Sequence, residues 1–482
     1  MLTCFKFVNI AVLTAVIIWC AGCMVGPDYQ RPKTTADEAE QFVNRSEIVS
    51  DCNDFAEAGQ WWKRFSDPVT DELVTEALAK NTDLKAAAAR LLQARAMLAE
   101  VKGARWPQIS YGFARNRSKM SFNSPFGERR SFLSTTYSQD ISVSYVTDLF
   151  GKLKRADRAA WAETLAAEAN QHALLHTIIA EVVRVRAQIA TLQRLSAIAK
   201  SNTDNWRMSL EVVDRRYSRG LTRPLDVRMA RENLAASEAA EIRIERLLAT
   251  AELGLDTLVG RRPGSSEPLP ETLAELPDPE PIPTGVPAGL LDRRPDIMTA
   301  EMRLIAATER VGVKIAQLYP DLTLTGSVGF RSDSLSEIFA NEGQVYSALM
   351  QIVQPIFRGG QLKAQIDSAK AKVEEETANY AGAILHALRE VEEALVRERL
   401  LRRQMAALET RLNEARAALD LSQRRYLRGV NSIIVVLETE RRKRIAENEL
   451  AAIKGDIWSA RIDLFLALGG DWEVESVKSG KW

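Results

Sequence analysis

Histidine, cysteine and aromatic residues are scarce in this chain of 482 residues, and so are the motifs of enzymes. His172 and His176 have the i, i+4 spacing of a helical zinc site, but Ala173 stands where a zinc protease needs its glutamate base. His386 is the one other histidine. No glycine-rich phosphate loop follows a predicted strand. We therefore expect no enzyme activity, no metal site and no cofactor.

Net charge is also absent, because 64 lysines and arginines balance 64 aspartates and glutamates. The balance removes the electrostatic argument for a nucleic-acid-binding protein. The basic run ERRKR at 440–444 is better explained as a solvated helix face. Apolar residues make up 46% of the chain, enough to bury a large core, and its many alanines, leucines, glutamates and arginines favour long helices.

The N-terminus has the features of an export signal. Lys6 precedes the apolar run Phe7–Trp19, whose 13 residues are too few to span a bilayer. The sequence CAGC follows, and its small residues before Cys23 match the cleavage pattern of a bacterial lipoprotein, so we predict that Cys23 is lipidated, with palmitate. Cys20 replaces the usual leucine of this pattern, which leaves an ordinary cleaved signal as the alternative. With Cys23 acylated, Cys52 would be a free thiol.

The rest of the chain is a tandem duplication of about 200 residues. The hexapeptide RRYSRG at 215–220 returns as RRYLRG at 424–429, 209 positions later. The segment 83–113 likewise resembles 296–330 at an offset of 213 in its helical part. Between the copies, residues 263–287 hold eight of the seventeen prolines, which predicts an extended linker.

Each copy has the same predicted order of elements. A helix of about 30 residues ends at a proline, Pro107 or Pro320. Two strands of about 9 to 10 residues alternate apolar and polar side chains and form one hairpin. Long helical stretches follow, from 154 and 361, and are interrupted by the hexapeptide. Their apolar residues have heptad spacing typical of coiled coils, although a helix broken into bundle pieces is the alternative: Leu401, Met405, Leu408, Leu412, Ala415 and Leu419; Leu450, Ile453, Ile457, Ala460, Leu464 and Ala467.

Four strands are too few for a closed barrel in a membrane, where an open edge would leave backbone groups unpaired. If the strands enter a membrane, several chains must share a barrel, and a trimer would supply twelve strands. A half-buried sheet of a soluble protein would show the same alternation, so the strands alone do not decide between these structures.

Five segments resemble the TolC-like outer-membrane factors, in particular the lipid-anchored relatives that serve RND efflux pumps. The resemblance lies in CMVGPDYQRP after the lipidation signal, WWKRFSDPVTDELVTEALAKNTDL (61–84), LLDRRPDIMTAE (290–301), RRYSRGLTRPLDV and RRYLRGVNSIIVVLETER. It implies a mainly α fold with β strands. In this fold three chains build one outer-membrane β-barrel, with four strands per chain, and continue it as a long periplasmic α-helical coiled-coil tunnel.

The predicted domains follow this organisation. They are a signal peptide (1–22), a lipid-anchored tail (23–60), a first repeat (61–260), a Pro-rich linker (261–290), a second repeat (291–470) and a C-terminal tail (471–482).

The two hexapeptides are expected at the tips of antiparallel helical hairpins, where Gly220 and Gly429 fit a left-handed or tight turn. The resemblance implies that these tips close the resting channel and bind a periplasmic adaptor. The residues predicted for docking are Tyr217, Arg219, Gly220, Tyr426, Arg428 and Gly429. The arginines would equally serve to keep exposed turns soluble.

The resemblance also assigns a periplasmic gate. It places the gate acid on Glu438, where aspartate is more usual, the apolar constriction on Ile434 and a pairing arginine on Arg441. Asp226 is the acid of the first tip, and Val435 replaces it in the second copy. Threefold symmetry would turn each carboxylate into a ring that favours cations. Glu438 and Arg441 would alternatively be i, i+3 partners on a solvated helix face.

The predicted function is that of a passive trimeric conduit in the bacterial outer membrane, reaching into the periplasm and gated at its periplasmic tip. Its expected partners are two further copies, a periplasmic adaptor, an inner-membrane pump of RND or another type and outer-membrane lipid, but no nucleic acid. The alternative is a non-conducting periplasmic coiled-coil scaffold or adaptor lipoprotein. The cargo does not follow from the sequence.

Overall fold

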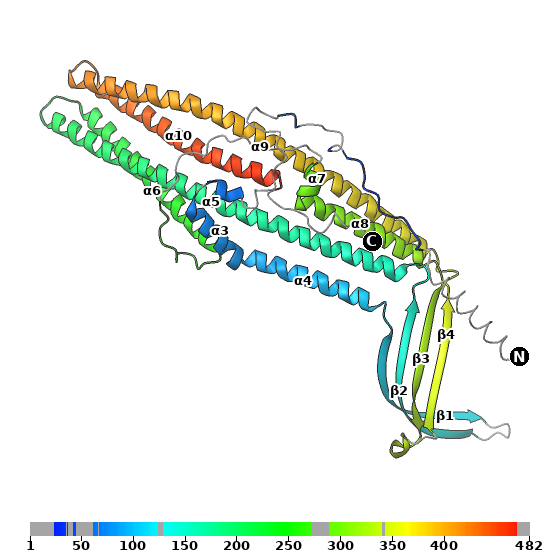
Figure 1. Ribbon diagram of the computed structural model, residues 1–482. Helices are drawn as coiled ribbons and strands as arrows, with labels where there is room; N and C mark the ends of the chain where they lie inside the picture. The colour runs from blue at the N-terminus through cyan, green and yellow to red at the C-terminus, as the bar shows by residue number, and fades with distance from the viewer. Residues whose placement is uncertain are drawn as a thin grey trace. The chain divides into compact units, whose positions relative to one another are not determined.

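The computed structural model describes residues 24–34, 36, 42–44, 61–65, 67–123, 129–270, 289–339 and 343–469. They form long helices and one antiparallel sheet (Figure 1). Spatial contacts divide the chain into two units. The sheet unit contains Arg90–Glu168, Thr299–Tyr380 and the N-terminal segment up to Pro32, and the tip unit contains Lys33–Ala89, Ala169–Met298 and the chain from Ala381 onward.

The helices confirm the tandem duplication, because they come in pairs of equal length. The pairs are α4 (Thr82–Gly103) and α8 (Pro295–Ala316), with 22 residues each; α5 (Lys152–Ser218) and α9 (Gln361–Leu427), with 67 each; and α6 (Pro224–Leu258) and α10 (Ile433–Ala467), with 35 each.

The first helix of each repeat is short, and the second is long and continuous. The first helix of each repeat has 22 residues, fewer than the predicted 30, and it ends four residues before the proline. The alternative of helices broken into bundle pieces is wrong, since α5 and α9 are continuous. All twelve predicted heptad residues are buried or half-buried. No helix among the described residues is both long and apolar enough to cross a bilayer.

Short elements fill the gaps between the long helices. They are η1 (Trp61–Phe65), α3 (Pro68–Lys80), α7 (Leu290–Arg293) and η3 (Leu335–Glu337). Helix α3 begins at Pro68, after an Asp67 side chain that accepts a hydrogen bond from Val69 N at 3.3 Å. The ring of Trp61 stacks on Phe465 of α10 at 5.4 Å, so η1 closes part of the core of the tip unit.

The four strands form one sheet in the order β1–β2–β3–β4, with β1 and β4 outermost. The strands are β1 (Gln108–Asn123), β2 (Arg129–Thr147), β3 (Asp321–Ser332) and β4 (Gln344–Val353). Each repeat supplies one antiparallel hairpin, as predicted, and β2 joins the two hairpins by pairing with β3. The predicted length of 9 to 10 residues is wrong for β1 and β2, which have 16 and 19 residues.

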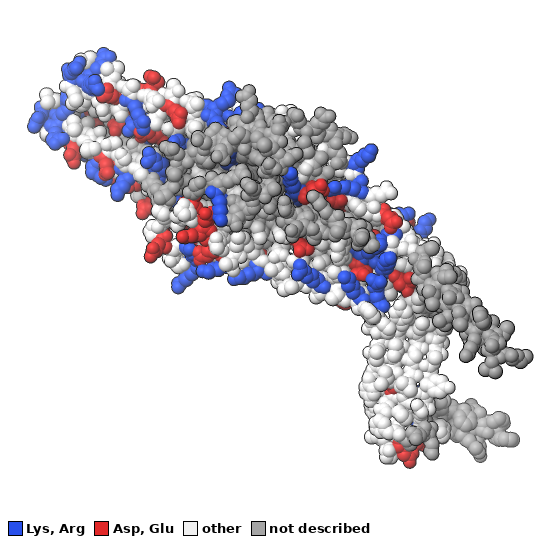
Figure 2. Space-filling view, in the orientation of Figure 1, with Lys and Arg blue, Asp and Glu red and all other residues white. Residues whose placement is uncertain are grey.

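The two faces of the sheet differ in polarity. Across the strands, Tyr111, Ile141, Val328 and Tyr346 are paired in one row, which belongs to the apolar face. On the opposite, polar face Ser110, Ser142, Ser327 and Ser347 form a row of four serines. The hydroxyls of Ser110 and Ser142 lie 2.7 Å apart, and those of Ser327 and Ser347 lie 2.8 Å apart. The side of the strands seen in Figure 2 is almost free of charge.

Arg155, on α5, binds the N-terminal segment (residues 24–31) within the sheet unit. Its guanidinium is 1% exposed, and all five N–H donors have acceptors. Three of the acceptors are the carbonyl oxygens of Val25, Gly26 and Pro27, at 2.9 to 3.2 Å. The others are carboxylates, Asp28 at 3.0 Å and the buried Glu309 at 2.9 Å. This segment follows Cys23 directly, although Cys23 itself lies outside the described residues.

Candidate functional site at the helical hairpin tips

The doubled hexapeptide ends two helices in the same way. In the first copy the Gly220 N–H donates to Tyr217 O and the Leu221 N–H to Arg216 O, both at 2.9 Å. In the second copy Gly429 and Val430 donate to Tyr426 O and Arg425 O, also at 2.9 Å. This pattern is a Schellman motif, which satisfies carbonyl groups left open at a helix end. The repeated letters therefore specify a helix end, and each copy stands where one long helix is followed by the next, α5 by α6 and α9 by α10.

Glycine is required at one position of each motif. Gly220 has a φ of 68° and Gly429 a φ of 74°, in the left-handed region that side chains with a Cβ disfavour. No other atom lies within 4 Å of a Cβ added at either residue. The backbone conformation alone, and not crowding, demands glycine there.

Asp226, the predicted gate acid of the first tip, lies in the first turn of α6. Its carboxylate accepts hydrogen bonds from Arg223 N at 3.1 Å and from Thr222 Oγ1 at 2.6 Å. In the second tip the Ser432 hydroxyl caps α10 by accepting from Ile434 N at 3.2 Å. Asp226 thus stabilises a helix start within its own chain. The sequence signal for this role was the acid two residues after Pro224, at the third position of the helix.

A shared apolar core joins the two hairpins near their tips. Its buried residues are Trp206 and Val213 of α5, Val227 and Ala230 of α6, and Ile433, Val436 and Leu437 of α10. Tyr426 packs against this core, whereas its counterpart Tyr217 is exposed. The Arg216 guanidinium lies 4.7 Å from the centroid of the Tyr426 ring, a cation–π contact between the two hairpins. Burial raises the pKa of Tyr426, so its hydroxyl stays neutral at physiological pH.

Glu438, the predicted gate acid of the second tip, pairs with arginines of its own helix. Its carboxylate accepts two hydrogen bonds from Arg441, both at 2.9 Å, and one from Arg442 at 2.8 Å. These bonds lower the pKa of Glu438 to about 2. Ile434, the predicted constriction residue, is 45% exposed and lies one turn before Glu438. Within one chain, Glu438, Arg441 and Arg442 therefore form a charged cluster, and Ile434 lies exposed one turn before it.

The tips carry an excess of positive charge. Lysine and arginine gather at the ends of both helical hairpins (Figure 2). Arg219 and Arg428, both predicted for docking, are exposed in the two turns. Arginines at the helix ends also complement the negative ends of the helix dipoles, which accounts for Arg215 and Arg424 without a partner protein.

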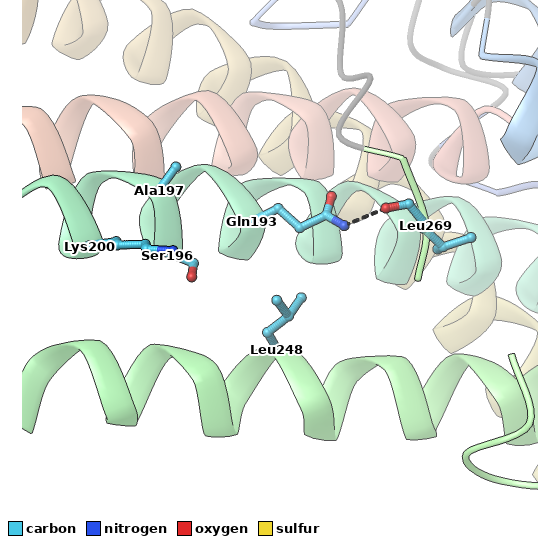
Figure 3. Close-up of a pocket in the computed structure, with 6 residues that line it drawn as sticks. All are labelled: Gln193, Ser196, Ala197, Lys200, Leu248 and Leu269. Atoms are coloured by element: carbon cyan, nitrogen blue, oxygen red, sulfur yellow. Dashed lines mark hydrogen bonds between the residues drawn. The ribbon is translucent and has the colours of Figure 1, made fainter. Parts of the chain in front are cut away.

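A small cavity lies elsewhere in the tip unit and does not resemble an active site. It is lined by Gln193, Ser196, Ala197 and Lys200 of α5, Leu248 of α6 and Leu269 (Figure 3), and has a volume of about 290 Å³. Gln193 Nε2 donates to Leu269 O at 2.8 Å, which ties the chain after α6 to α5. The cavity contains neither a carboxylate nor a histidine.

The histidine pair does not assemble a metal site with other ligands. Burial, followed by the charge of His172, lowers the pKa of His176 to about 4, so His176 is neutral at physiological pH. Among the residues that the structure describes, no three histidine, cysteine, aspartate or glutamate side chains are grouped as metal ligands.

The chain is similar to bacterial efflux proteins along most of its length. The family model described as outer membrane efflux protein matches residues 73–261 and 286–470. The probable efflux pump outer membrane protein SepC of Pseudomonas putida is 29% identical over 459 residues, which cover 94% of this chain and 95% of SepC. Outer membrane protein OprJ of Pseudomonas aeruginosa is 30% identical over 466 residues, which cover 94% of this chain and 93% of OprJ.

A solved structure of the outer-membrane channel OprN has the same fold. It matches with a TM-score of 0.85 and 30% sequence identity, covering 93% of this chain and 99% of OprN. A solved structure of CusC matches with a TM-score of 0.81 and 26% identity, covering 93% of this chain and all of CusC (100%). These likenesses support a channel over the alternative of a non-conducting scaffold. The chain belongs to the outer membrane efflux protein family, whose members are channels of efflux systems that reach from the outer membrane into the periplasm and are not enzymes.

Proposed function

We propose that three copies of this chain form one passive conduit from the periplasm to the exterior. The observation that carries the proposal is the open four-stranded sheet, whose apolar face exposes large side chains such as Ile109 and Tyr111. Three such sheets joined edge to edge would give twelve strands, with the apolar face toward lipid and the serine row toward the lumen. Closure would also pair the outer edges of β1 and β4, which have no strand partner in the described part of the chain.

The test is the mass and conductance of the detergent-purified protein. A trimer that produces discrete current steps in planar bilayers supports the proposal. A monomer, or a trimer that conducts no ions, contradicts it.

We also propose that Asp226, Ile434, Glu438 and Arg441 form the periplasmic gate. In a trimer each residue would occur three times around one axis, and Arg441 would hold the Glu438 carboxylates through charge-assisted bonds. The exposed Ile434 would supply the apolar constriction. The internal pairing of Glu438 with Arg441 and Arg442 would need to be shared with, or exchanged for, contacts between copies.

The gate is tested with substitutions that remove charge but keep hydrogen-bond acceptors. Asp226→Asn retains an oxygen for Arg223 N and Thr222, and Glu438→Gln retains one for Arg441. The double variant should show a higher single-channel conductance. Unchanged conductance would mean that both acids serve only their own helices. Glu447→Gln, which changes a carboxylate nine residues further along α10, is the matched control.

A third proposal concerns docking. The hairpin of a periplasmic adaptor, which links this channel to an inner-membrane pump of the RND type or another type, would contact Tyr217, Arg219, Gly220, Tyr426, Arg428 and Gly429. The support is the exposure of both turns and their equivalence within one chain. Arg219→Glu combined with Arg428→Glu should reduce cross-linking to the cognate adaptor, and unreduced cross-linking would refute the role of these arginines.

We further propose that Cys23 is lipidated and that the two repeats have the limits predicted from the sequence. Arg155 holds the residues directly after Cys23, which would fix a lipid anchor near the end of β2, where Val25 N donates to Phe150 O at 3.3 Å. Mass spectrometry of the N-terminal peptide should detect an acylated Cys23, and an unmodified Cys23 would refute the anchor. The two family-model matches, 73–261 and 286–470, support repeats at 61–260 and 291–470.

A further inference from the structure

Three cations lie in a row on β1, close to its turn. Arg115, Arg117 and Lys119 occupy alternate positions, so their side chains leave the same face of the strand. At about 3.4 Å per residue, the backbone positions of neighbouring cations are roughly 7 Å apart and the three positions extend over about 14 Å. All three residues are exposed. None of them has an acidic partner among the described residues.

The row continues the apolar face of the sheet. Ile109, Tyr111 and Phe113 precede it on the same side of β1 and are 54 to 72% exposed. On β2 the paired residues are Tyr137, Thr135 and Leu133, which carry no charge. The sole acidic residue of the two strands, Asp140, pairs with Gly112 and Gly329 and so belongs to the polar face. Arg331 of β3 pairs with Ser138 and belongs to that polar face as well.

An aromatic residue, Tyr137, lies opposite Arg115, where the basic part of this face begins. The Arg115 guanidinium lies 5.5 Å from the centroid of the Tyr137 ring. The order of apolar, aromatic and basic side chains along one face matches the layers of a bilayer surface, where tyrosine lies at headgroup level and cations lie among the headgroups.

The basic row lies at the end of the sheet that is remote from the helices in sequence. Helix α4 precedes β1 and α5 follows β2 at the other end of this hairpin. Strand β2 pairs with β3 only from Tyr137 onward, so residues 116–123 and 129–136 pair with each other beyond the edge of the second hairpin. If the helices are periplasmic, the row is at the outer leaflet.

We propose that Arg115, Arg117 and Lys119 bind the phosphate groups of anionic lipids in the outer leaflet, a site that rests on the proposed orientation of the channel. A lipid surface fits better than free phosphate, because the cations continue an exposed apolar face formed by Ile109, Tyr111 and Phe113, as headgroup-binding cations do next to acyl chains. Several phosphates spaced across a membrane surface would each meet one cation. The contacts would fix the height of the sheet in the bilayer.

The experiment uses the detergent-purified full-length channel and three probes: bisphosphorylated lipid A, its dephosphorylated form, and inorganic phosphate. Replacing all three cations by glutamine should weaken binding of bisphosphorylated lipid A about hundredfold, since each cation near an anionic surface contributes about a factor of five. The dephosphorylated lipid should bind weakly to both proteins, and millimolar inorganic phosphate should not compete. The control replaces the exposed Arg90, Lys102 and Arg403 by glutamine, with the same change of charge and unchanged lipid binding expected.

The outcomes separate this proposal from the proposed function. Equal binding of bisphosphorylated lipid A by the wild type and the β1 variant would overturn the lipid site. Competition by inorganic phosphate would also overturn it, in favour of a simple anion site. Conductance of the β1 variant in planar bilayers is measured in parallel. If both proteins conduct but bind lipid equally, the lipid site alone fails; if neither conducts, the conduit itself fails.

Discussion

Replacing Arg155 by methionine should release residues 25–28 from the sheet unit, while Tyr29 and Arg31 keep their bonds to Glu301. The substitution keeps an aliphatic side chain but removes all five donors. Glu309, 7% exposed, would lose its closest cationic partner, and the carbonyl oxygens of Val25, Gly26 and Pro27 would lose theirs. Asp28 is 75% exposed, so water replaces its lost contact at little cost.

The buried ion pair sets the size of the effect. Removing one partner of such a pair costs about 3 to 5 kcal/mol, because a charge is left without compensation in the interior. Arg158 reduces this cost only slightly, since its guanidinium is 3.8 Å from Glu309 and 22% exposed. A decrease of about 3 kcal/mol in the free energy of local opening corresponds to an exchange rate more than a hundredfold faster.

The assay is hydrogen exchange of the peptide that contains Val25, whose amide donates to Phe150 O. Arg155→Met should accelerate its exchange more than a hundredfold, and Arg155→Lys less, because lysine keeps the charge but loses the fork of donors. Arg158→Met is the matched control and should change the rate by less than about fivefold, as expected for a weak, partly exposed pair. Exchange in Arg155→Met within threefold of the wild type would refute the role of Arg155.

Three further predictions concern the tips. The pKa of Glu438 is lowered to about 2, so its ion pairs persist above pH 4 and are lost only as the pH falls through about 2. Glu438→Gln should therefore change the single-channel conductance by the same factor at every pH from 4 to 8. A factor that varies with pH would contradict this. Gly429→Ala should destabilise the protein by about 1 to 2 kcal/mol and Gly429→Asn by less, measured as denaturant midpoints; equal midpoints would contradict the left-handed turn. A double-mutant cycle of Arg216→Gln and Tyr426→Leu should give a coupling of about 0.5 to 1 kcal/mol, and strict additivity would exclude the cation–π contact.

Much of the fold could be predicted because the sequence contains two copies of the same structural repeat. Gly220 and Gly429 follow the last turns of helices in equivalent positions, so the repeated motif predicted both helix ends from the sequence alone. The heptad residues of α9 and α10 likewise identified the packed sides of those helices. Duplication helps because two independent copies of a pattern rarely agree by chance, whereas one copy of RRYSRG would have been a weak signal.

The strand lengths could not be predicted from alternation. The apolar pattern of β1 ends at Phe113, and Arg115, Arg117 and Lys119 then occupy the same face. Backbone pairing with β2 nevertheless continues to Asn123, because ladder hydrogen bonds do not depend on side-chain polarity. The change from apolar to basic marks a change of surroundings along one strand, not its end.

The residues that contact the site residues could not be predicted from the sequence either. The two copies of the motif have the same Arg-Arg-Tyr letters, yet Tyr426 is half-buried under Arg216 of the other hairpin while Tyr217 is exposed. That difference comes from the packing of α5, α6 and α10 around a common core. The role of Asp226 at a helix start follows from its position two residues after Pro224, whereas a role in a gate depends on neighbouring copies of the chain.

The most direct test of the central claim is the conductance of the purified protein in a planar bilayer, with the mass of the conducting species determined in the same detergent. A trimer should give discrete current steps, and the variant that carries both Asp226→Asn and Glu438→Gln should give larger ones. A homogeneous trimer without conductance, for both the wild type and this variant, would contradict the account of a conduit gated at its tips.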